Sequence, residues 1–169
     1  LNQIKKIISI SFLYSVFITI ETYVISGIML GSFLNNWERS DSTVFQCYGD
    51  TELWGRIVPY LKTWIILSTI FVLLFVGLIA IGMLIGALKM YLDSKYVYLI
   101  LIIIVLCEVV ISGFYFIIKR MALSVGDFIE PQIIILKVLF LTVLEILAFI
   151  IGKGYVVKRD FFTKKQYEE

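Results

Sequence analysis

Apolar residues gather in four long blocks along the chain, and polar residues separate the blocks. Each block is long enough to cross the roughly 30 Å hydrocarbon core of a bilayer, which takes about 20 residues of helix. No block shows the strict alternation of a membrane β-strand. The pattern predicts an all-α integral membrane protein, a bundle of four transmembrane helices at about residues 7–33, 64–88, 96–118 and 132–151.

The polar segments predict how the bundle lies in the membrane. Nine of the fifteen basic residues fall in the N-terminus, the connection 89–95 and the tail 152–169, and six fall elsewhere. Because basic residues favour the cytoplasmic side, both termini are expected inside and the loop 34–63 outside. The first block lacks a small-residue cleavage site and is expected to be retained as a span. The chain 1–169 is thus predicted to be a single, multi-pass membrane domain.

Composition agrees with this interpretation and narrows the function. Hydrophobic residues make up 60% of the chain, against about 45–50% in soluble domains, and the net charge is only +2. The chain has no histidine, which excludes His-ligated metals and His general bases. It has no phosphate-binding glycine loop, nucleophile elbow or C-x-x-C motif. We therefore expect no enzyme activity, no cofactor, no metal site and no nucleic-acid partner.

The two cysteines are expected to stay unpaired within the chain. Cys107 falls inside an apolar block and Cys47 falls in the polar loop, so the two belong to different environments. An intermolecular disulfide and a free thiol both remain open for Cys47.

Three carboxylates interrupt the apolar blocks, each near the middle of its block: Glu21, Glu108 and Glu145. A charged carboxylate facing lipid costs about 2.5–3.5 kcal/mol, so these groups should face protein or water, or be protonated. The sequence predicts that they lie near one depth. Polar residues share the expected helix faces of the last two: Ser112, Tyr115 and Thr142.

The carboxylates allow two interpretations. They could line a path for ions, protons or polar solutes, or they could hydrogen-bond within the bundle and pair with cations of a partner subunit. The only cation of this chain at comparable depth is Lys137, which we expect to extend its ammonium outward to the membrane surface.

Two further patterns predict helix packing. The first block carries a stripe of hydroxyl residues, and the second carries a G-x-x-x-G pair that allows close approach of another helix. The hydroxyls could bond across helices, or they could bond carbonyl groups of their own helix. The packing residues are Ser15, Thr19, Thr22, Ser26, Gly82 and Gly86.

These observations favour a non-catalytic, membrane-embedded subunit or accessory protein of a larger membrane complex. The alternative is a small oligomeric channel or transporter that uses the intramembrane carboxylates. The expected partners are the lipid bilayer and either other membrane subunits or further copies of the chain.

Overall fold

The computed structural model describes residues 2–29, 31, 33, 45–46, 49–111, 117–124, 127, 130 and 132–167, with side chains as far as Tyr155. Every regular element in these residues is a helix. The longest helices are α1 (Asn2–Met29), α4 (Thr63–Tyr91) and α8 (Gln132–Tyr167).

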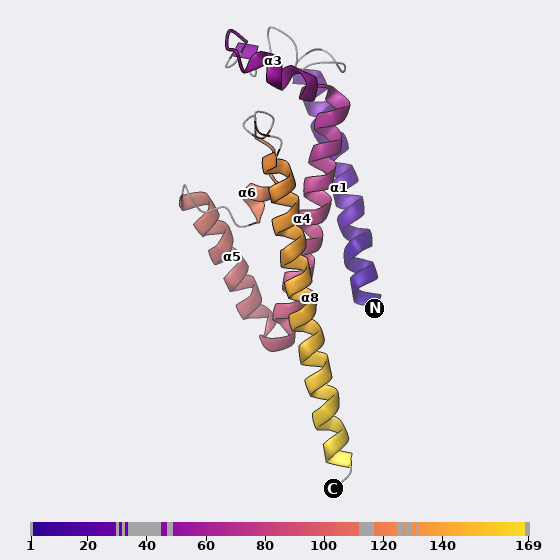
Figure 1. The fold of residues 1–169 in the computed structure, drawn as a ribbon. Coiled ribbons are helices and arrows are strands. Elements are labelled where there is room, and N and C mark those ends of the chain that lie inside the picture. The colour runs from indigo at the N-terminus through magenta and orange to yellow at the C-terminus, as the bar shows by residue number, and fades with distance from the viewer. Residues whose placement is uncertain are drawn as a thin grey trace.

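These three helices are long and apolar enough to cross a membrane. The apolar stretches are Gln3–Met29, Thr63–Tyr91 and Gln132–Tyr155, and at 1.5 Å per residue even the shortest extends about 36 Å. The all-helical prediction is confirmed for the described residues, and these three helices support the predicted multi-pass membrane class. Figure 1 shows α4 between α1 and α8, with the start of α1 and the end of α4 at the same end of the bundle.

Aromatic and small residues hold α1 against α4. The ring of Phe12 meets Phe71 and Phe75 edge-on, with centroid distances of 5.8 and 6.0 Å. Nearer the start of α1, Ile7 packs directly on Gly82, where a Cβ atom would come within 2.7 Å of the Ile7 side chain. The two helices therefore run antiparallel in close contact.

The helices α4 and α8 run in the same direction and are joined at two levels. In the middle, Ala80 and Leu141 share a buried cluster with Ile117. At the end of α4, the Tyr91 hydroxyl donates a hydrogen bond of 3.1 Å to the Ile151 carbonyl, and its ring packs on Tyr155. These contacts fix the register of α8 along α4.

The predicted third span differs in the structure. Helix α5 (Ser94–Val110) has 17 residues, about 25 Å, and Ile111 has an extended backbone. Beyond residues 112–116, a four-residue helix α6 (Ile118–Met121) follows. The predicted helix 96–118 is therefore too long at its end, where the sequence "ISGFYF" is rich in residues of low helix propensity. Helix α5 leans away from the other long helices, and only two of its side chains are buried (Figure 1).

The segment before α4 covers the start of that helix. It contains α3 (Trp54–Ile57) and the 3-10 helix η1 (Val58–Tyr60). Ile57 and Leu61 are buried there against Ile66 of α4, so this part of the predicted outer loop packs on the bundle.

Candidate functional site

The short helix α6 lies beside the middle of α4. Its Met121 side chain occupies the place where a Cβ atom of Gly77 would be, and Gly77 is the central residue of α4. Helix α6 also contacts α8. If α4 spans the membrane, α6 lies at the depth of the hydrocarbon core, where a backbone outside a spanning helix is tolerated only against protein or a water-filled cavity.

Glu108 binds the start of α6. Its Oε1 accepts a hydrogen bond from the Ile117 N–H, and its Oε2 accepts one of 2.9 Å from the Lys119 N–H. The first N–H groups of a helix have no partner within the helix, and a negative charge there is favoured by the helix dipole. Glu108 is 1% exposed, so its carboxylate accepts these hydrogen bonds inside the protein. Its predicted neighbours Ser112 and Tyr115 lie outside the described residues.

A buried lysine binds the other end of α6. The Lys137 ammonium donates to the carbonyl of Ala122, the residue that follows α6, at 2.8 Å. It also forms an ion pair of 2.7 Å with Asp127, whose Oδ2 accepts the Ser124 N–H as well. The prediction that Lys137 extends to the membrane surface was wrong, because a carboxylate ten residues earlier in the chain neutralises it inside the protein.

The basic residues of α6 itself are also engaged. The Arg120 guanidinium lies 4.2 Å from the centre of the Phe140 ring, and the Lys119 ammonium donates to the Ile111 carbonyl at 3.1 Å. Three cations and the two carboxylates Glu108 and Asp127 give this α6 cluster a formal charge of +1 (3 − 2). The α6 cluster is a set of charges arranged around one short helix.

Glu145 has a different environment on α8. Its Oε1 is buried and accepts no hydrogen bond from any described residue. The nearby Thr142 hydroxyl donates to the Val138 carbonyl at 2.9 Å, which uses its only hydrogen. Thr142 and Glu145 thus lie on the same helix, as predicted, but the Thr142 hydroxyl does not donate a hydrogen bond to Glu145.

Glu21 is exposed on α1. It belongs to a row of exposed residues spaced by four, three, four, three and four positions, called here the Glu21 stripe. The other members are Ile10, Tyr14, Phe17, Val24 and Ile28.

The structure places the carboxylates at different depths, contrary to the prediction. Since Phe12 meets α4 at Phe71 and Phe75, Glu21 lies nearer the start of α4. Glu145 follows Leu141, which packs beside Ala80, and therefore lies beyond the middle of α4. Glu21 is thus level with about residue 64 of α4 and Glu145 with about residue 84, a separation of about 20 residues (84 − 64), or about 30 Å. One chain does not bring Glu21 and Glu145 into a common site.

The hydroxyl stripe of α1 bonds its own helix. The hydroxyls of Ser15, Thr19 and Thr22 donate to carbonyls four residues earlier, at 2.7, 2.7 and 2.8 Å, and Ser26 donates to the Tyr23 carbonyl at 3.0 Å. Of the predicted glycine pair, Gly82 contacts Ile7, as described above. A Cβ on Gly86, by contrast, would have no atom within 4 Å.

Within the described part of the chain, no group of three or more His, Cys, Asp or Glu side chains is placed to hold a metal ion. Cys107 is a free thiol, and Cys47 lies outside the described residues. Comparison with protein-family models, curated proteins and solved structures finds no match to this chain.

Proposed function

We propose that this chain is a non-catalytic subunit or accessory protein of a larger membrane complex, and that the Glu21 stripe contacts a helix of its partner. The observation that carries the proposal is the exposed carboxylate of Glu21 on an otherwise apolar face of a membrane helix.

The cost of exposing Glu21 to lipid supports this function. A carboxylate at the centre of a membrane helix costs about 2.5–3.5 kcal/mol. Glu21 lies eight residues from the end of α1, about 12 Å, and so bears part of that cost. A partner that donates a hydrogen bond or a positive charge at this depth would remove it.

The spacing of the stripe supports a helix as the partner. Alternating steps of three and four residues place the side chains on one seam, as in paired helices. A helix with Lys or Arg opposite Glu21 fits this seam best. A second copy packed in parallel register would place two carboxylates together, which disfavours the charged form of both.

The proposal includes the membrane topology. We take α5 as a fourth span with both termini on the cytoplasmic side, because its 17 residues reach the lower limit for a span and because basic residues are more numerous on that side.

The alternative function is a small oligomeric channel or transporter. The α6 cluster favours it, since short helices and charges at membrane depth are also found along transport paths. In this version the path would use the intramembrane carboxylates, and within one chain Glu21 and Glu145 lie too far apart along α4 to share a single site.

The test compares assembly in the native membrane for three forms of the chain. We expect Glu21→Leu to release the chain from its complex. The substitution removes the polar contact with the partner, and it also removes the free-energy cost of exposing a carboxylate to lipid. The matched control is Ile20→Ala, which alters an exposed side chain next to Glu21 but outside the stripe. The measurement is native mass spectrometry after mild extraction. An unchanged complex mass for Glu21→Leu would refute the proposal, and proton- or cation-dependent flux by the purified chain alone would favour the alternative.

A further inference from the structure

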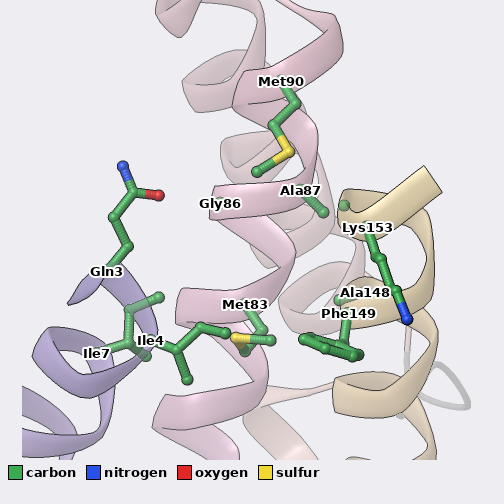
Figure 2. A pocket seen from close by; sticks show the side chains of 11 residues that line it. Gln3, Ile4, Ile7, Met83, Gly86, Ala87, Met90, Ala148, Phe149 and Lys153 are labelled. Atoms are coloured by element: carbon green, nitrogen blue, oxygen red, sulfur yellow. The ribbon is translucent and has the colours of Figure 1, made fainter. Parts of the chain in front are cut away.

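An apolar cavity of about 410 Å³ opens between α1, α4 and α8. Figure 2 shows α1 and α8 on either side of α4, with Met83 and Phe149 directed toward each other near one end of the cavity and Met90 at the other. The polar lining residues are Gln3 and Lys153. The apolar and small residues that define its walls include Ile4, Ile7, Met83, Gly86, Ala87 and Phe149.

The cavity exists because its floor lacks side chains while its walls are held apart. No atom lies within 4 Å of the position that a Cβ of Gly86 would take. On one side, Ile7 packs on Gly82 and fixes α1 to α4. On the other side, the hydrogen bond from Tyr91 to Ile151 fixes α4 to α8. The described side chains therefore leave this space unfilled.

The cavity lies near the start of α1 and the end of α4, in a basic environment. The apolar stretch of α1 begins here at Gln3, and that of α4 ends here at Tyr91. Lys153 lies on the cavity wall, and further lysines are exposed on the same turns of α1 and α4. The sequence of the surrounding segments 2–10, 83–92 and 148–155 contains no Asp or Glu. An anionic group is therefore favoured at the mouth of the cavity.

We propose that this cavity binds one acyl chain of an anionic phospholipid from the adjacent leaflet, with the headgroup phosphate beside Lys153. An empty space beside lipid loses dispersion contacts on every wall, and the bilayer supplies acyl chains that restore them. The cavity opens between the helices and its lining is mainly apolar, which suits a narrow, linear acyl chain.

The test uses the full chain reconstituted in vesicles of equal parts phosphatidylglycerol and phosphatidylcholine, followed by native mass spectrometry in mild detergent. We expect the wild type to retain one phosphatidylglycerol per chain. Gly86→Leu fills the cavity and should reduce retention at least tenfold, and it should not weaken the helix, because Leu is a better helix former than Gly. Gly154→Leu is the matched control, because Gly154 is exposed on α8 with no atom near its Cβ position, and it should retain the lipid.

A second variant tests the headgroup contact without changing the cavity. Lys153→Gln should reduce the preference for phosphatidylglycerol over phosphatidylcholine about fivefold, the factor that corresponds to about 1 kcal/mol for one basic residue near an anionic surface. Equal retention of phosphatidylglycerol by Gly86→Leu and wild type would overturn the proposed site. Equal retention of the two lipids by the wild type would overturn the assignment of an anionic ligand.

Discussion

Removal of the Glu108 carboxylate should open α6 while the long helices remain intact. In Glu108→Ala, the buried N–H group of Ile117 and the partly buried N–H group of Lys119 lose their acceptors. An unsatisfied buried donor costs about 1–3 kcal/mol, so the loss at Ile117 together with a smaller loss at Lys119 is about 2–4 kcal/mol. Glu108→Gln keeps one carbonyl oxygen and should lose about half of this.

Hydrogen exchange measures this loss locally. A cost of 2 kcal/mol corresponds to about a thirtyfold increase in the opening of α6, since 1.4 kcal/mol is a factor of ten. We expect amides in residues 117–124 to exchange at least thirtyfold faster in Glu108→Ala in lipid nanodiscs, while amides in the middle of α4 keep their rates. Val109→Ala is the control, because the side chain of Val109 is 74% exposed and contributes little to the bundle. The same exchange rate in Glu108→Ala and wild type would refute the capping role.

Two further predictions concern the packing around α6. Lys137→Met should destabilise the protein by about 3–5 kcal/mol because it leaves Asp127 buried and unpaired, and adding Asp127→Leu should recover most of this loss. Thermal unfolding in detergent measures the stability of both variants. Destabilisation by the double variant equal to the sum of the two single variants would contradict the ion-pair argument. Gly77→Leu should destabilise the protein by about 1–3 kcal/mol or more, because the new side chain overlaps with Met121. Met121→Ala should partly restore the stability of this variant. Full stability of Gly77→Leu alone would show that α6 does not pack against Gly77.

The long helices could be predicted from the sequence because their length and apolar content decide their structure locally. Helix α4 was expected at 64–88 and is found at Thr63–Tyr91, and the last apolar stretch was expected at 132–151 and is found at Gln132–Tyr155. Local hydropathy is sufficient here, because a backbone in lipid must satisfy its own hydrogen bonds and a helix is the simplest way to do so.

The end of α5 and the position of α6 could not be predicted in the same way. The segment up to Ile118 is predominantly apolar, so hydropathy does not mark the break, and the low helix propensity of "ISGFYF" does not by itself end a helix. The break depends on hydrogen bonds that backbone N–H groups 9 and 11 residues later donate to Glu108, and these exist only after the chain has turned back. Lys137 was misjudged for a related reason. Five residues into a membrane helix, a lysine usually reaches the surface, and only the folded loop brings Asp127 to it.

The carboxylates were predicted at a common depth because hydropathy considers each span separately. Each glutamate is near the middle of its own apolar block, but the register between blocks depends on packing. The contact of Phe12 with Phe75 and that of Leu141 with Ala80 decide how far α1 and α8 are shifted along α4. These contacts are specific to the folded chain and leave no signal in hydropathy.

The three carboxylates therefore differ in what their variants can reveal. Glu108 is bound to α6 from both of its oxygens, so loss of assembly or flux in its variants follows from local unfolding alone and does not identify a path or a partner. Glu21 is exposed on a helix that packs through other residues, so replacing it should leave the fold unchanged. A complex that dissociates in Glu21→Leu, in a chain whose α6 amides remain protected, would locate the partner at α1. Dissociation together with loss of α6 protection would instead show that the effect is transmitted through the fold, and the proposed interface would be wrong.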